Sequence, residues 1–229
     1  MDLREALRTT GAAREFDGTT IERSVIYDLL DTARFAPNGG NRQGWRVVVV
    51  DDPVRRRALR DAYLPGWYEY LAQAKAGLVP FAPVTDRAAE TAATARADEE
   101  ARAAAQGPGG FAEHLDDAPV LLLLLADLRF VAALDRDASR YTLVGGASIY
   151  PFAWSILLAA RDAGLGGVLT TMVARREDEI RALFSLEAHH CVAGLLALGR
   201  PVFQPTRLRR NAVESFATVD TADGEPFTR

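Results

Sequence analysis

The chain of 229 residues has only one cysteine, Cys191, and three histidines, His114, His189 and His190. A single cysteine excludes an internal disulfide and fits a reducing compartment, and its apolar setting predicts a buried, inert thiol. No histidine is spaced from a Cys, Asp or Glu in the manner of a metal site, and adjacent histidines on a strand point to opposite faces. We therefore expect no metal ion.

Long hydrophobic runs and an excess of positive charge are missing as well. The longest uncharged apolar runs, 118–126 and 147–160, fall short of the ~20 residues that a membrane-spanning helix requires. The first residues contain no apolar stretch of the kind found in signal peptides. The net charge is −4, and no basic stripe interleaved with aromatic residues indicates nucleic-acid binding. These absences predict a cytoplasmic protein with no membrane or nucleic-acid partner.

The sequence motifs of several enzyme classes are absent. There is no Gly-x-Ser-x-Gly elbow of a hydrolase and no Gly-x-x-x-x-Gly-Lys-Ser/Thr loop for a nucleotide phosphate. Glycines 164, 166 and 167 follow a predicted helix and precede a predicted strand, which reverses the order of a dinucleotide-binding motif. Without an evident acid, base or nucleophile, the sequence favours chemistry carried out by a bound cofactor.

The residues that are present fit one globular domain over 1–229, with 48% apolar and 25% charged residues and no repeat. Hydrophobic periodicity and turn residues predict the following elements. Helices are expected at 20–35, 145–163 and 175–184, with a further helix capped by Asp52, and strands at 47–50, 120–125, 168–173 and 191–198. The helix at 145–163 is apolar on nearly every side, so it should lie inside the protein or inside a dimer.

Three local expectations follow from the same patterns. Thr19 and Glu22 have the spacing of a capping box for the first of these helices. The all-valine strand at 47–50 should be buried on both faces. The four arginines in the early part of the helix after Asp52 should form a solvated face; they are residues 55, 56, 57 and 60.

Two segments differ in character from this core. Between 65 and 110 the hydrophobic periodicity weakens, prolines interrupt, and a Gly-Pro-Gly-Gly run closes the segment, which marks an excursion. Its aromatic residues Trp67, Tyr68 and Tyr70 either contact a ligand or pack the excursion onto the body. Residues 202–229 are polar, basic and interrupted by proline, and such a tail cannot form a core of its own.

The stretch from 35 to 50 is the most informative part of the chain. A predicted helix stops at Pro37, and a loop with two Asn, one Gln and three Gly follows before Trp45 opens the valine strand. Glycines in such a loop permit positive φ, and amides offer donors and acceptors together, as a heteroaromatic ligand requires. Asn41 and Gln43 are therefore candidates for holding the edge of a cofactor. The alternative is an ordinary helix-to-strand connection.

Residues 36–45, Ala-Pro-Asn-Gly-Gly-Asn-Arg-Gln-Gly-Trp, resemble the Ala-Pro-Ser-x-x-Asn-x-Gln-Pro-Trp signature of the FMN-dependent nitroreductase family. Asn38 stands where that family often has Ser, and Gly44 where it usually has Pro. Gly-Leu-Gly at 164–166 is similar to the end of the family's central helix, and Gly-Arg-Pro at 199–201 to its Gly-Tyr-Pro. The three blocks occur in the family's order and span most of the chain.

This resemblance implies an α+β fold with a central, mostly antiparallel sheet flanked by helices. It also implies a homodimer that holds FMN at the subunit interface. Residues 65–110 would form a variable lid over the flavin, and residues 202–229 would extend onto the partner subunit.

The resemblance also assigns candidate flavin contacts near the N-terminus. Arg14 corresponds to the last Arg of the family's Arg-Arg-Ser-x-Arg motif, which here reads Thr-Gly-Ala-Ala-Arg from Thr10. Both early arginines and the serine are missing, so Thr10 is expected to replace the hydroxyl and Arg8 to reach in from one helical turn away. Asn41 corresponds to the family's flavin-contacting Asn, and Gln43 follows at the usual spacing. A surface salt bridge is the alternative role for Arg14.

Two further groups of flavin contacts are implied later in the chain. Thr170, Thr171 and Met172 correspond to the backbone that family members place beside flavin N5 and O4, where N–H donors stabilise the reduced ring. The basic cluster of the tail corresponds to the family's phosphate-binding pair, because arginine binds phosphate through a bidentate fork. The cluster consists of Arg207, Arg209 and Arg210. A solvated charge run is the alternative for these arginines.

The implied activity is an NAD(P)H-driven reduction. NADH or NADPH would reduce FMN at N5, and an electron-poor small molecule such as a nitroaromatic or quinone would then take its place, in a ping-pong mechanism. No side chain is assigned a catalytic role. Relatives on the same fold suggest dehalogenation, ring oxidation or flavin cleavage as alternatives. The missing Arg-Arg-Ser and Gly44 suggest a non-catalytic flavin-binding paralogue.

Overall fold

The sheet is assembled around β2 (Val120–Asp127), an apolar strand that is buried along its whole length. The computed structural model describes all residues from 1 to 229. β2 pairs antiparallel with β1 (Trp45–Val49) and β4 (His190–Gly199), and β3 (Gly166–Thr170) pairs antiparallel with β4. The order β1-β2-β4-β3 makes β1 and β3 the edge strands. These directions bring the start of β1 and the ends of β2 and β3 to the same end of the sheet.

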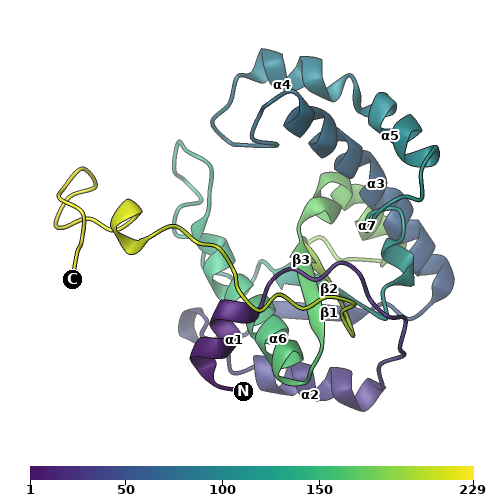
Figure 1. The fold of residues 1–229 in the computed structure, drawn as a ribbon, viewed down its shortest axis with the longest axis horizontal. Helices are drawn as coiled ribbons and strands as arrows, with labels where there is room; N and C mark the ends of the chain where they lie inside the picture. The colour runs from purple at the N-terminus through teal and green to yellow at the C-terminus, as the bar shows by residue number, and fades with distance from the viewer.

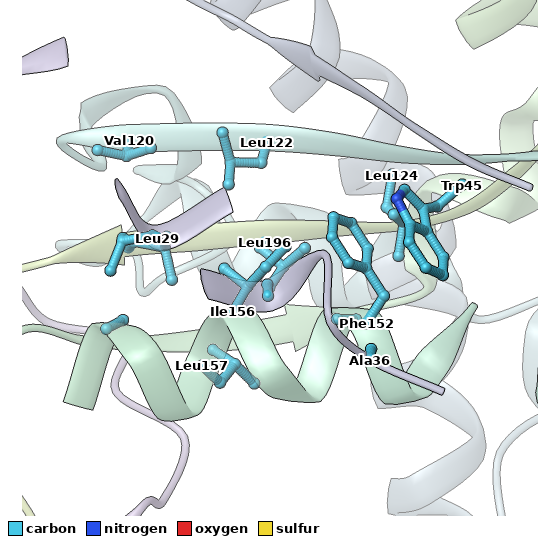
Figure 2. Close-up of a cluster of buried hydrophobic side chains, with 14 of the residues drawn as sticks. Leu29, Ala36, Trp45, Val120, Leu122, Leu124, Phe152, Ile156, Leu157 and Leu196 are labelled. Atoms are coloured by element: carbon cyan, nitrogen blue, oxygen red, sulfur yellow. The ribbon is translucent and has the colours of Figure 1, made fainter. Parts of the chain in front are cut away.

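Helices cover both faces of the sheet (Figure 1). One face packs against α2 (Arg23–Ala33) and α6 (Tyr150–Asp162), and the other against α3 (Pro53–Lys75) and α7 (Glu177–Leu183). Successive residues of β2 alternate between the two cores, with Leu122 on the α6 side and Leu121 on the α3 side. In the α6 core, shown in Figure 2, Trp45 stacks on Phe152 with ring centroids 4.6 Å apart. A strand that is apolar up to Asp127 therefore occupies the centre of a three-layer structure.

The remaining helices lie at the periphery: α1 (Leu3–Thr9), α4 (Arg87–Thr94) and α5 (Ala97–Ala105). Short 3-10 turns occur at Gly39–Asn41, Leu115–Asp117, Val144–Ser148, Met172–Arg176 and Val213–Ser215. None of the helices combines the length and the hydrophobicity needed to span a membrane.

The excursion after residue 65 begins inside α3, which continues through Pro65 as one helix. The Gln73 side chain is buried, donating to Thr94 Oγ1 at 3.0 Å and accepting from the Phe81 N–H at 2.9 Å. One carboxamide thus ties α3 to α4 and to the loop between them.

The C-terminal residues 202–229 form an arm that lies against the N-terminal segment up to Leu208 and then leaves the body (Figure 1). The arm has one 3-10 turn and an isolated bridge between Thr218 and Pro226. Phe216 and Phe227 remain exposed, because the arm makes only local hydrogen bonds beyond residue 210 and has no core of its own.

Several expected details differ in the structure. β1 is only partly buried, with Val49 39% exposed, because an edge strand is covered less completely than a central one. The expected capping box does not form, since Glu22 makes no capping hydrogen bond and the Thr19 N–H binds Asp17. The cap at Asp52 is confirmed by a 2.8 Å hydrogen bond from the first turn of α3.

The helix predicted at 145–163 is shorter than expected. A 3-10 turn at Val144–Ser148 precedes α6, and Gly164 follows its end with a φ of 75°, as predicted for a C-terminal glycine. The outer face of α6 carries Tyr150 and Trp154, which are 41% and 39% exposed. In a single chain this helix is therefore covered on one side only.

The expectation of a solvated arginine face on α3 is wrong for two of the four residues. The Arg56 guanidinium donates to the backbone oxygens of Val50, Asp116 and Ala118, and burial lowers its pKa. Arg60 binds the Asp116 carboxylate at 3.0 Å. These contacts hold the start of α3 against the end of β1 and against the end of the 3-10 turn that precedes β2.

We expect Arg56→Met to lower the free energy of unfolding by about 1–3 kcal/mol, because three carbonyl oxygens lose a charged donor. The matched control is Arg57→Met, which removes an exposed guanidinium that makes no hydrogen bond. Urea denaturation of both variants measures the difference. Equal stabilities of the two variants would contradict the role assigned to Arg56.

Candidate functional site

The outer edge of β3 is covered only at its beginning. The N-terminal segment pairs there through a parallel bridge between Ala12 and Gly167, with the Ala13 N–H 2.9 Å from the Gly167 oxygen. No other segment pairs with this edge between residues 168 and 170. The backbone groups on this edge are therefore available to a ligand, and the predicted contact Thr170 is the last residue of the strand.

The C-terminal segment lies against the same N-terminal residues. Gln204 Nε2 donates to the Thr9 oxygen at 3.0 Å, and a Cβ on Gly11 would lie 3.0 Å from both Pro205 and Leu208. The structure therefore places the part of the chain that carries the basic cluster beside residues 9–11. Thr10 is buried, and its Oγ1 has no hydrogen-bond partner. Gln204 Oε1 is also buried without a hydrogen-bond partner, so two polar atoms lack partners where the N-terminal and C-terminal segments meet.

Three of the predicted cations have no acidic partner. Arg14, Arg207 and Arg209 are exposed, and their side chains make neither an ion pair nor a hydrogen bond in the structure. The Arg210 side chain donates to the Arg209 oxygen. The salt bridge considered as an alternative for Arg14 does not form.

Tyr63 contacts the end of β3, and the sequence alone did not single it out. Its hydroxyl lies 3.1 Å from Thr170 Oγ1, and its ring is buried on α3. Burial raises the pKa of Tyr63, while the Thr170 hydrogen bond and the nearby charge of Arg14 lower it. The phenol is therefore hydrogen-bonded to Thr170 and lies within range of the charge of Arg14. The available signal was a tyrosine four residues after the buried Leu59, because a buried hydroxyl needs a partner.

The strand predicted to reach residue 173 ends earlier, at Thr170. Thr171 is exposed, and Met172 begins a 3-10 turn. Its sulfur packs against α3, where a Cβ on Gly66 would lie 3.0 Å away. The close approach of α3 therefore turns the chain away from the sheet after residue 170.

Asn41 and Gln43 lie beyond the opposite edge of the sheet, before β1. Both are exposed and have a φ of 52°, and Gln43 Nε2 is 3.4 Å from Asn41 Oδ1. Three strand spacings of about 4.8 Å separate β1 from β3. One chain therefore does not bring these carboxamides to the residues around Thr170.

The aromatic residues of the excursion pack mainly with one another. Trp67 stacks on Tyr70 with ring centroids 5.3 Å apart, and Trp67 also packs against the core on the α3 side. Of the two roles considered for these aromatics, the contacts of Trp67 and Tyr70 match packing of the excursion onto the body.

The expectation that adjacent histidines diverge is wrong. His189 lies in the turn before β4, so the centroids of its ring and of the His190 ring are only 4.3 Å apart. Possible ligand atoms of the two histidines and of Asp127 lie within 4.8 Å of one another. However, both carboxylate oxygens of Asp127 accept from Arg129, at 3.0 and 2.8 Å, and these bonds lower the pKa of Asp127. Arg46 Nη2 lies 3.6 Å from Oδ2 of the same carboxylate. The charge of Asp127 is therefore neutralised by guanidinium groups, which a metal ion would have to displace.

Comparison with known proteins places these features in a family. The model of the Nitroreductase family matches residues 7–200, and the chain belongs to this family. The predicted α+β fold with an antiparallel sheet is confirmed. Family membership supports an oxidoreductase that uses a flavin.

Individual relatives extend over most of the chain. It is 29% identical to an NADH dehydrogenase from Thermus thermophilus over 201 residues, covering 88% of this chain and 87% of that protein. It is 28% identical to iodotyrosine deiodinase 1 from Pongo abelii over 198 residues, which are 86% of this chain and 60% of that protein. A BluB-like flavoprotein from Clostridium difficile has a similar fold, with a TM-score of 0.69 at 18% identity, covering 96% of this chain and all of that one.

We expect Gly66→Val to lower the free energy of unfolding by about 1–3 kcal/mol, because the new side chain would collide with Met172 and Arg175. Hydrogen exchange in residues 170–176 should also become faster. Ala74→Val, at an exposed position of the same helix, is the control for placing a β-branched residue in α3. Unchanged exchange in residues 170–176 would contradict a direct contact with α3.

Proposed function

We propose that the protein is an FMN-dependent oxidoreductase that takes electrons from NADH or NADPH and reduces an electron-poor small molecule such as a nitroaromatic or a quinone. The observation that carries this proposal is the free edge of β3, flanked by the N-terminal segment and the basic arm. The NADH dehydrogenase relative supports the electron donor. An FMN-dependent nitroreductase from Clostridium difficile, with a TM-score of 0.56 at 17% identity, has a similar fold.

The polar groups at this edge fit the chemistry of FMN. A ribityl phosphate carries hydroxyl donors and anionic acceptors, which match the unpartnered Gln204 Oε1 and Thr10 Oγ1. The unpaired Arg14, Arg207 and Arg209 supply charge for an anion, and arginine suits phosphate through its bidentate fork. The candidate cofactor-binding residues therefore remain those predicted from the sequence.

Each partner in this arrangement has a distinct role. When bound, FMN would supply the redox chemistry by accepting a hydride and passing electrons to the acceptor. The protein contributes position and electrostatics. The backbone N–H groups of Thr170 and Thr171 would offer donors at the end of β3, and the arginines would hold the phosphate.

We further propose a homodimer in which each flavin site takes residues from both subunits. Asn41 and Gln43 lie too far from β3 to join the site within one chain, so the partner's loop would supply them. The exposed Tyr150 and Trp154 on α6 offer an apolar surface for such a partner. In this single-domain arrangement residues 65–110 serve as the lid and residues 202–229 as an extension onto the second subunit.

The proposed function is tested by adding FMN to the purified protein and recording its absorption spectrum. We expect a bound flavin with a perturbed spectrum, and rapid bleaching in a stopped-flow instrument when NADH or NADPH is mixed in. Reoxidation by a nitroaromatic compound completes the cycle. A protein that acquires no flavin spectrum would overturn the proposal.

Other flavin chemistry is the second candidate, favoured by the relationship to iodotyrosine deiodinase and by the BluB-like fold. In that case the flavoprotein would be inert to both nicotinamides but would turn over an iodotyrosine with a chemical reductant. Tight flavin binding without turnover of either kind would indicate a flavin-binding protein without catalysis.

The proposed phosphate contacts predict a difference between two flavins. The double variant Arg207→Gln/Arg209→Gln should bind FMN about tenfold to hundredfold more weakly, because charge-assisted hydrogen bonds to the phosphate are lost. Riboflavin, which lacks the phosphate, should bind equally to variant and wild type. Arg55→Gln, an exposed arginine on α3, is the control. An equal loss of affinity for both flavins would contradict phosphate recognition by these arginines.

The shared site predicts complementation between two inactive variants. Asn41→Ala/Gln43→Ala and Arg207→Gln/Arg209→Gln should each bind FMN poorly. After the two chains are unfolded and refolded together, half of the dimers combine one chain of each kind. Each hybrid then has one intact site, so about a quarter of wild-type binding should return. No recovery in the mixture would show that each site is built from one chain.

A further inference from the structure

Tyr63 is a buried phenol with one polar contact outside its own helix. It is 3% exposed, and its hydroxyl lies 3.1 Å from Oγ1 of Thr170. Trp67, with its ring centroid 6.5 Å away, packs beside it on the same helix. A buried hydroxyl without a partner is unfavourable, so this contact decides where the phenol points. It also joins α3 to the last residue of the free strand edge.

The Thr170 hydroxyl also accepts a hydrogen bond from the backbone. The Met172 N–H lies 3.4 Å from Thr170 Oγ1. A hydroxyl oxygen accepts two hydrogen bonds and donates one. When Tyr63 donates as well, both acceptor positions of Thr170 are filled and its own proton is free. Thr170 is only half-buried, so this proton is available to an acceptor at the edge of β3.

The charged groups around Tyr63 come from two other segments. Arg14 of the N-terminal segment and Glu113 of the loop before β2 act on the phenol in opposite directions, and burial is the largest effect, raising its pKa. The phenol therefore stays protonated at neutral pH and remains able to donate. Tyr63 is thus a neutral phenol that can donate to Thr170.

We propose that Tyr63 is a positioning residue of the flavin site, which orients the Thr170 hydroxyl so that it donates to FMN bound along the edge of β3. The inference rests on the proposed function. Tyr63 itself does not touch the flavin. It acts by filling an acceptor position on Thr170, which directs the threonine proton outward.

The test is Tyr63→Phe, which removes one oxygen and keeps the buried ring. The loss of one oriented hydrogen bond should raise the FMN dissociation constant about threefold to tenfold and shift the visible absorption band of the bound flavin. If the hydroxyl prefers the reduced flavin, each tenfold loss of that preference lowers the two-electron midpoint potential by about 30 mV. The control is Tyr70→Phe, because the Tyr70 hydroxyl makes no hydrogen bond in the structure.

A second pair of variants separates positioning from packing. Thr170→Val should reproduce the effect of Tyr63→Phe, and the double variant should add nothing further, because both act through one hydroxyl. Thr170→Ser keeps the hydroxyl and should restore wild-type binding and absorption.

The outcomes distinguish this inference from the proposed function. If Tyr63→Phe lowers the melting temperature but leaves the FMN affinity, the absorption band and the midpoint potential unchanged from the wild type, the phenol only packs α3 against the sheet and the inference is overturned. The proposed function would then stand. If the wild-type protein binds no FMN, the function itself fails and the inference falls with it.

Discussion

The site depends on how closely the chain packs around the start of β3. A Cβ on Gly167 would lie 2.4 Å from the Leu198 side chain and 2.6 Å from the Ala197 oxygen, and one on Gly166 would lie 3.0 Å from Ala13. Larger residues would push the N-terminal segment off the strand or β3 off the sheet. Because the segment pairs only with the start of β3, the remaining edge keeps free backbone donors beside unpaired arginines. The outer edge of β3 is thus paired at the start of the strand and has unpaired backbone groups at its end.

The other end of β3 is set from the opposite side by α3. Gly66 allows Met172 to pack directly on the helix, and Tyr63 binds the side chain of Thr170. The contacts that attach α3 to the sheet therefore also determine where the strand ends and which donors it presents. The stability of α3 and the geometry of the site are linked for this reason. The Gln73 carboxamide extends the link to α4.

Much of the fold followed from local patterns in the sequence. The apolar runs of β2 and β4, the cap at Asp52 and the glycine after α6 were all predicted, because each depends on residues close together in the chain. Predictions about exposure and partners were less successful. Arg56 was expected in solvent, yet it binds three carbonyl oxygens from segments before and after α3. The two adjacent histidines converge because one of them lies in a turn, which alternation along a strand does not describe.

The sequence by itself determined the family, the types of residue at the candidate site and the order of the elements, because motifs and periodicity are local properties. Only the tertiary structure decided which of these residues meet. Tyr63 and Thr170 are 107 positions apart, and their contact depends on how α3 packs against the sheet. The separation of Asn41 and Gln43 from β3 depends in the same way on strand order. Contacts of this kind arise from the packing of whole elements, which no short stretch of sequence encodes.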